Sequence, residues 1–183
     1  MKPVPLLRLL SKNLRIKKRY KNKTNEDNRK MNLLLNIHDF NLEKIFFLDK
    51  KQNIIMEGFF TKIIFSNDFV TMNGLFFDFP LKINGMNKIN NNLNILHFHH
   101  DNKEFIQNLY IIEKRLLEYY VHFYGINKTP AHNLKNQLQC GSVKFYKEDC
   151  LTDKYRSPLF YIKISGIWEN QHNIGITYKI IEY

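Results

Sequence analysis

Residues 102–124 constrain the architecture most, because they carry the clearest helical pattern in the sequence and strand-like segments lie on both sides of them. Apolar residues recur here three or four positions apart, a spacing that places their side chains on one face of a helix. These residues are Phe105, Leu109, Ile112, Leu116, Tyr119 or Tyr120, and Phe123. Gly125 follows, and glycine often ends a helix because it readily adopts a left-handed backbone conformation. We therefore predict one long helix over about 102–124.

The segments before this helix are short apolar runs, rich in β-branched and aromatic residues and separated by polar turns, a pattern typical of β-strands. The runs are 33–37, 45–48, 54–65, 69–72, 75–83 and 95–98. Asn73-Gly74 lies between two of them, and both residues tolerate the positive φ of a tight hairpin turn. We therefore expect a β-meander of at least three strands, and a surface loop over 84–94.

Strand patterns return after the helix at 143–146, 159–168 and 175–181, whereas 132–138 is ambiguous. The last two runs flank a polar turn and predict a hairpin. Strands, one helix and further strands indicate an α+β fold with a mostly antiparallel sheet. The oligonucleotide-binding (OB) barrel has the same order of elements, so we expect an OB-like barrel or a curved sheet.

Basic residues are concentrated at the N-terminus. Residues 1–30 contain 11 Lys and Arg but only 2 Asp and Glu, a net charge of +9 out of the total of +11. Asn, Lys, Ile, Phe and Tyr are all abundant, as the codons of an AT-rich genome favour, so the position of the charge is more informative than its total. We predict a disordered basic arm over 1–30 and a single α+β domain over 31–183.

The basic arm has three interpretations. It contacts phosphate groups or directs entry into the nucleus, it is an organellar presequence, or it only increases solubility. The first interpretation assigns phosphate contacts to Arg15, Lys17, Lys18, Arg19 and Lys21. Two cysteines do not make a disulfide framework, so we expect an intracellular location.

The sequence contains no motif that indicates catalysis. Neither of two common phosphate-binding motifs, Gly-x-x-x-x-Gly-Lys-Ser/Thr and Gly-x-Gly-x-x-Gly, occurs in the sequence. His97 and His99 would share one face of a strand, but no second group of ligands accompanies them, and Cys140 and Cys150 lack the spacing of a metal or redox pair. No apolar run approaches 18 residues in length. We therefore expect no enzyme activity, no metal, no cofactor and no membrane span.

The strands combine aromatic rings with lysines, which is what binding of single-stranded nucleic acid requires, because rings stack on bases and ammonium groups contact phosphates. In Lys144-Phe145-Tyr146, Lys144 and Tyr146 share a face and Phe145 points the opposite way. The predicted contact residues of the domain are Lys62, Lys144, Tyr146, Tyr161, Lys163, Trp168, Tyr178 and Lys179. The alternative is that most of these rings belong to the core, since sheets favour aromatic residues.

The C-terminal half carries a series of short motifs. They are Ile112-Glu113, Leu117, Tyr119-Tyr120, Lys128, Gly141 with Val143-Lys144-Phe145-Tyr146, Ile162 to Glu169, and Gly175 to Lys179. Across roughly residues 55–183, the chain resembles single-stranded-DNA-binding proteins of large double-stranded DNA viruses, which contain an OB barrel. The resemblance implies DNA binding during viral replication or recombination, in the host nucleus or at a viral replication site. Such barrels often end in an acidic tail, whereas this sequence ends in Ile181-Glu182-Tyr183, so recruitment of replication partners through such a tail is not expected.

Two functional hypotheses follow. In the first, the protein binds single-stranded nucleic acid without sequence preference, and DNA is favoured over RNA. In the second, it is a non-enzymatic viral structural or host-interaction protein whose basic arm contacts nucleic acid or a partner. Both hypotheses are compatible with a homo-oligomer.

Overall fold

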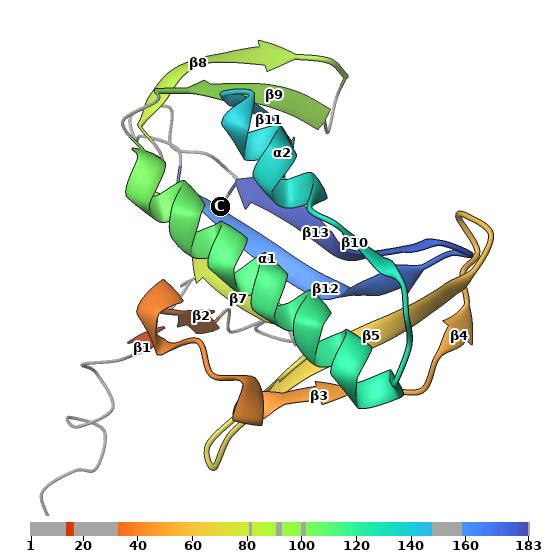
Figure 1. Cartoon of the computed structure of the whole chain (residues 1–183). Helices are drawn as coiled ribbons and strands as arrows, with labels where there is room; N and C mark the ends of the chain where they lie inside the picture. Colours follow the sequence, from red (N-terminus) through yellow and green to blue (C-terminus); the bar gives the residue numbers. More distant parts are fainter. Residues whose placement is uncertain are drawn as a thin grey trace, which may run out of the picture.

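The protein is α+β, and most of its regular structure is a mixed β-sheet on which two α-helices pack (Figure 1). The structure, a computed structural model, describes residues 14–16, 33–80, 82–90, 93–99, 102–147 and 159–182. Most strand pairs are antiparallel, as expected, and the α+β class that the sequence predicts is confirmed.

The centre of the sheet is a hairpin of two long strands, β12 (Phe160–Glu169) and β13 (Asn173–Glu182). Their antiparallel register runs from Phe160 opposite Glu182 to Glu169 opposite Ile174, with a β-bulge between Ile164 and Gly166. The predicted hairpin over 159–168 and 175–181 is confirmed.

Each edge of this hairpin is shared by two other strands. β7 (Leu75–Asp78) pairs with the first half of β12 and β5 (Phe59–Ser66) pairs with its second half, both antiparallel. On the other edge, β10 (Thr129–Ala131) and β11 (Ser142–Lys147) both pair with β13 in parallel. The hairpin therefore organises four shorter strands around itself.

The remaining strands extend the sheet outward or flank β5. Beyond β11 lie β9 (Leu93–Phe98) and β8 (Ile83–Lys88), and beyond β7 lie β2 (Leu33–Leu35) and β1 (Leu14–Ile16). The strands that pair with β5 alone are β3 (Ile45–Phe47), β4 (Lys51–Gln52) and β6 (Thr71–Met72). Two short 3-10 helices, η3 (Ile37–Asp39) and η4 (Leu42–Lys44), connect β2 to β3.

In the part of the chain that the structure describes, the sheet is not closed into a barrel. Its order runs β1-β2-β7-β12-β13-β11-β9-β8, and the first and last of these strands do not pair with each other. β12 and β13 each change partner halfway along, so the sheet branches at both strands. Of the two expected arrangements, the closed barrel is therefore not found.

Two predictions about the first strands are wrong. Asn73-Gly74 does not join paired strands, because β6 pairs with β5 whereas β7 pairs with β12 and β2. Gly74 (φ +109°) instead leads the chain onto β12, where a Cβ would lie 2.6 Å from the carbonyl oxygen of Ile164. The predicted loop 84–94 contributes to the β8–β9 hairpin, which its asparagine-rich sequence does not reveal.

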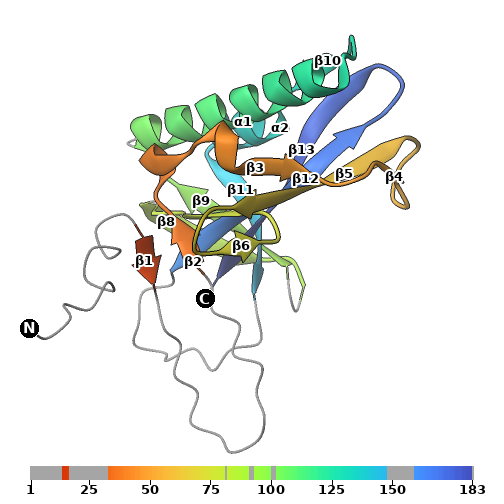
Figure 2. The same ribbon diagram turned by 90° about the horizontal axis from the view of Figure 1, so that it is seen from below.

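Helix α1 (Lys103–Tyr124) lies along one face of the sheet, in the range that the sequence predicts, and α2 (Asn133–Gln139) lies beside it (Figures 1 and 2). Gly125 ends α1 in the left-handed conformation, with φ +59°. The side chains of α1 that pack into the core are Leu109, Ile112, Leu116, Leu117 and Tyr120. The ambiguous segment 132–138 contributes most of α2.

Of the predicted basic arm, the structure describes only Leu14–Ile16. These residues form β1, which pairs antiparallel with β2 and places Arg15 opposite Leu34. The structure thus contains a short strand at these three positions within the predicted arm. The remaining residues of 1–30, which include Lys17, Lys18, Arg19 and Lys21, lie outside the described residues.

Replacing Leu116 by alanine tests the packing of α1 on the sheet. Leu116 is 0% exposed, and we expect its loss to lower the free energy of unfolding by about 2–5 kcal/mol, because buried apolar surface is lost and a cavity remains. Ile111→Ala is the matched control, since Ile111 is 42% exposed on the same helix, and it should cost less than about 1 kcal/mol. Urea denaturation measures both values, and equal costs would contradict this packing.

Candidate nucleic-acid interface

The two faces of the central hairpin differ in chemistry. On one face, residues such as Ile162, Ile167 and Ile176 join the helices in the core. The alternate positions, with their neighbours on β5 and β11, belong to the opposite face. We call this opposite face the lysine face, because it carries Lys62, Lys144, Lys163 and Lys179.

Three of these lysines form a row across adjacent strands. Lys163 of β12 lies directly opposite Lys179 of β13. On the other side of β13, Phe145 is level with Ile180, so Lys144 of β11 lies beside Lys179. Neighbouring strands are about 4.8 Å apart, so the row spans about 10 Å. Clustered ammonium groups of this kind bind phosphate.

An aromatic ring and a fourth lysine lie next to this row. The Nζ of Lys163 lies 5.0 Å from the ring centroid of Phe76 in β7, a cation–π contact. Lys62 of β5 lies opposite Gly166 of β12, which in turn lies opposite Thr177 of β13. The lysines of this face therefore extend from β11 to β5.

Two aromatic rings lie next to the lysines. Phe60, Trp168 and Gly175 are in register across β5, β12 and β13. A Cβ on Gly175 would lie 2.4 Å from Cζ2 of Trp168, and a Cβ on Gly166 would lie 2.4 Å from Cζ of Phe60. Each ring thus covers a glycine of the neighbouring strand, and both rings remain partly exposed. This arrangement stabilises a sheet and also leaves flat apolar surfaces exposed, which is the kind of surface that base stacking requires.

A pocket of about 330 Å³ adjoins this surface. One side is formed by Phe60 and Thr177 of the lysine face, and the other by residues 51–55 at the β4–β5 hairpin. At the tip of that hairpin, Ile54 is 99% exposed and Ile55 is 95% exposed. Large apolar side chains in such a position are costly in water and indicate a binding surface.

A polar network holds the base of the β4–β5 hairpin. The Nζ of Lys50 lies 2.8 Å from Oε2 of Glu169, and the Nζ of Lys128 lies 2.6 Å from Oε1. Tyr120 donates to Glu169 at 3.0 Å, and its hydroxyl lies 2.9 Å from that of Thr61. The network connects α1, β5, β12 and the segments before β4 and β10.

The charge state of this network follows from its contacts. Burial alone would raise the pKa of the Glu169 carboxyl, but hydrogen bonds from Lys128, Lys50 and Tyr120 outweigh it and hold the pKa below its ordinary value. Glu169 is only 5% exposed, so its carboxylate is a buried charge with two cationic partners. We assign it a structural role, because breaking a buried pair leaves an uncompensated charge.

A second buried acid fixes α2. Glu113 of α1 is 0% exposed and accepts hydrogen bonds from the backbone N–H groups of Leu134 (3.1 Å) and Lys135 (3.0 Å). Burial raises the pKa of the Glu113 carboxyl, although these two hydrogen bonds act in the opposite direction. Tyr178 of β13 donates to Gln137 of α2, and burial raises the pKa of this tyrosine to about 12.

The structure brings together only part of the predicted site. Lys62, Lys144, Lys163, Trp168 and Lys179 share the lysine face. Tyr178 instead lies on the face covered by the helices, because it alternates with Lys179. Tyr161 is on the lysine side, but it is only 3% exposed, since it packs with Leu34, Phe76 and Ile181.

Two of these rings are therefore packing residues in this structure, as the core alternative for the aromatics predicts. The backbone of Tyr146 lies in β11, opposite Ile181 of β13. The side chain of Tyr146 lies outside the described part of the structure. Arg15 lies in β1, away from the central row in strand order.

Two features of this surface are not evident from the sequence. Phe76 is not among the predicted contact residues, although its ring lies 5.0 Å from the Nζ of Lys163. The exposed hairpin tip is hidden in the sequence, because residues 54–65 form one apolar run that favours a single strand. Gly166 and Gly175 are the sequence features that could have indicated this surface, because a glycine in a sheet leaves room for an aromatic ring of the neighbouring strand to cover it.

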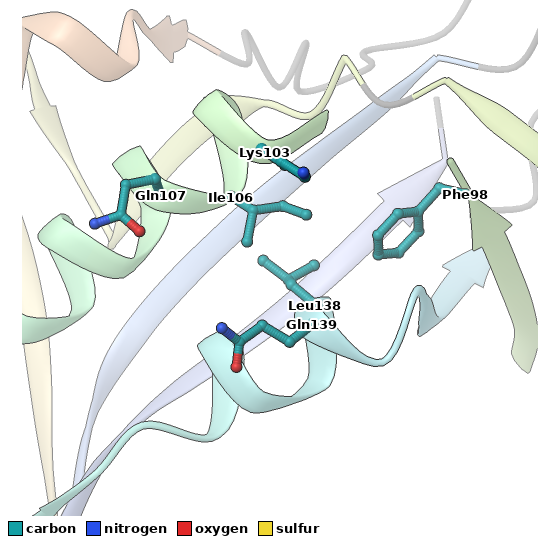
Figure 3. Close-up of a pocket in the computed structure, with 6 residues that line it drawn as sticks. All are labelled: Phe98, Lys103, Ile106, Gln107, Leu138 and Gln139. Atoms are coloured by element: carbon teal, nitrogen blue, oxygen red, sulfur yellow. The ribbon is translucent and has the colours of Figure 1, made fainter. Parts of the chain in front are cut away.

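A pocket of about 360 Å³ lies between the start of α1, the end of α2 and the end of β9 (Figure 3). Its lining residues are Phe98, Lys103, Ile106, Gln107, Leu138 and Gln139. The described residues contain no group of three or more His, Cys, Asp and Glu that could hold a metal ion. Within the same ranges, no helix is long and apolar enough to cross a membrane.

Comparison with protein-family models, curated proteins and solved structures finds no match to this chain.

Glu169→Gln tests the polar network. A carboxyl whose pKa is lower in the folded state stabilises the protein above its unfolded pKa, and this contribution is lost as the pH falls through the folded value. We expect the variant to lose about 1–3 kcal/mol of unfolding free energy at pH 7. The wild-type advantage should shrink as the pH falls below the ordinary value of 4.5.

Denaturation at a series of pH values measures this advantage. Glu118→Gln is the control, because Glu118 forms only an exposed pair with Lys114 at 3.7 Å. An advantage of the wild type over Glu169→Gln that stays constant into acid would show that the ion pairs of Glu169 do not stabilise the fold.

Proposed function

We propose that this protein binds single-stranded nucleic acid, with DNA favoured, through the lysine face and without sequence preference. The observation that carries the proposal is the register of β12 with β13 and β5. It places Lys62, Lys163 and Lys179 on the same face as Phe60 and Trp168. Charge for phosphates and rings for bases thus share one surface.

The positions of the side chains on the sheet assign phosphates and bases to different rows. Along β13, Gly175, Thr177 and Lys179 lie on one face, and successive positions on a face are about 7 Å apart. A strand whose phosphates lie on Lys163 and Lys179 would extend its bases toward the row of Phe60 and Trp168. Stacking accepts any base, because every base has a flat face, and this supports binding without sequence preference.

An unpaired strand suits this surface better than a duplex. The rings of Phe60 and Trp168 lie against glycines of the sheet and do not project as wedges. Only bases that are not stacked inside a duplex can lie on them. The resemblance to viral single-stranded-DNA-binding proteins supports DNA and a role in viral replication or recombination, in the host nucleus or at a viral replication site. An organellar location through residues 1–30 is the alternative for the cell compartment.

A second candidate function is that of a non-enzymatic viral structural or host-interaction protein whose basic arm contacts nucleic acid or a partner. One observation favours it. Phe46 of β3 is 51% exposed, Leu48 is 46% exposed and Phe123 of α1 is 56% exposed. Exposed apolar residues of this kind supply contacts to other proteins. In this case the basic arm, and not the lysine face, would carry all affinity for nucleic acid.

The double variant Lys163→Ala, Lys179→Ala tests the primary proposal. We expect its affinity for a labelled oligothymidylate at low salt to fall by about tenfold or more, because phosphate contacts are lost. The slope of log affinity against log salt should become shallower by about 1–2. Fluorescence anisotropy over a salt series measures both quantities.

The control is Lys103→Ala, Lys114→Ala, which removes the same charge from α1 on the other side of the sheet. It should leave the slope unchanged. A wild-type chain that binds no oligonucleotide at low salt would end the proposal.

A variant of the full chain with all 11 Lys and Arg of residues 1–30 changed to alanine separates the two candidate functions. Under the primary proposal, the lysine face retains measurable affinity for single strands. Under the second, the same titration shows that all affinity is lost with the basic residues of the arm.

A further inference from the structure

We propose that the pocket beside the lysine face holds one nucleobase of the bound strand, between Phe60 on one side and Ile54 and Ile55 on the other. This inference rests on the proposed function and names a subsite within it. The pocket has a volume of about 330 Å³, at the lower end of the range for small organic groups.

The walls of the pocket suit a base. The ring of Phe60 lies against Gly166, so its position is fixed by the sheet. Ile54 and Ile55 supply apolar surface on the hairpin side, and Gln52 and Asn53 bring amide groups to the lining. A flat apolar group with a polar edge matches this combination, because its faces meet the apolar walls and its edge meets the amides.

The hairpin tip is held in place, although its isoleucines are almost fully exposed. The N–H of Asn53 donates to the carbonyl of Gly58 at 2.9 Å, and the N–H of Ile55 donates to Oδ1 of Asn53 at 3.0 Å. Gly58 has a φ of +121°, and a Cβ there would lie 2.0 Å from the carbonyl oxygen of Glu169. Together with the pair of Lys50 and Glu169, these contacts orient the hairpin against β12.

The pocket is also in the correct place relative to the charges. Phe60 lies two residues from Lys62 on β5, and Thr177 lies two residues from Lys179 on β13, in each case on the same face. Both walls on the sheet side are thus about 7 Å from a lysine. A nucleotide joins a flat apolar base to a phosphate a few ångströms away. One nucleotide can therefore place its base in the pocket and its phosphate on the neighbouring lysine.

This charge complementarity decides between possible occupants. A lipid surface or an apolar partner would meet Ile54 and Ile55 at the tip, but it would not need the ring of Phe60 or the lysines beside the walls. A nucleobase uses the tip, the ring and the neighbouring positive charge at once. We therefore assign the pocket to a base.

The test compares two ligands of equal length, an oligothymidylate and the same strand with every base removed. Anisotropy titrations give the ratio of the two affinities for each full-length variant. We expect Ile54→Ser, Ile55→Ser to lower this ratio by about tenfold, because stacking on a base is lost while phosphate contacts remain. The control Ile89→Ser, Ile111→Ser changes two isoleucines that are 48% and 42% exposed elsewhere, and should leave the ratio unchanged.

The outcomes separate this inference from the proposed function. If the hairpin variant lowers both affinities equally, or neither, the pocket does not hold a base, while binding to the lysine face stands. If the wild type binds neither strand, both proposals are overturned. If wild type but not the hairpin variant cosediments with vesicles of phosphatidylcholine and phosphatidylserine, and the affinity ratio stays constant, the tip binds lipid and the inference fails.

Discussion

The pairing of β12 with β13 is the interaction on which the rest of the structure depends. Their register places Ile162 opposite Ile180 on the helix side and Lys163 opposite Lys179 on the other side. A shift of one residue in either strand would bring lysines into the core, so burial of the isoleucines fixes the register. The apolar packing that stabilises the fold therefore also aligns the charges of the proposed binding surface.

Glu169, at the end of the same strand, connects this sheet to the hairpin that lines the pocket. Its carboxylate meets Lys50 and Lys128, and its carbonyl oxygen lies against Gly58. The hairpin can therefore present exposed isoleucines without being a free loop. The cost of exposing them is consistent with a surface that is covered when a ligand binds.

Local patterns predicted the elements better than their arrangement. The helix at 103–124 and the hairpin at 160–182 could be found because their periodicity and turns lie within a few neighbouring residues. The sequence predicted a local meander around Asn73-Gly74. In the structure β7 pairs instead with β12, which joins positions far apart in the sequence. Alternation places the candidate lysines on one face, but it does not show that Tyr161 is buried and that Tyr178 packs against α2, because only tertiary packing decides which rings are covered.

Photo-crosslinking tests the central claim most directly. An oligothymidylate that carries photoreactive 5-iodouracil would be irradiated with the full-length protein, and mass spectrometry would identify the attached residue. If bases stack on the lysine face, crosslinks should form at Trp168 or Phe60, the two rings that cover Gly175 and Gly166. Crosslinks confined to residues 1–30 or to α1 would contradict the account.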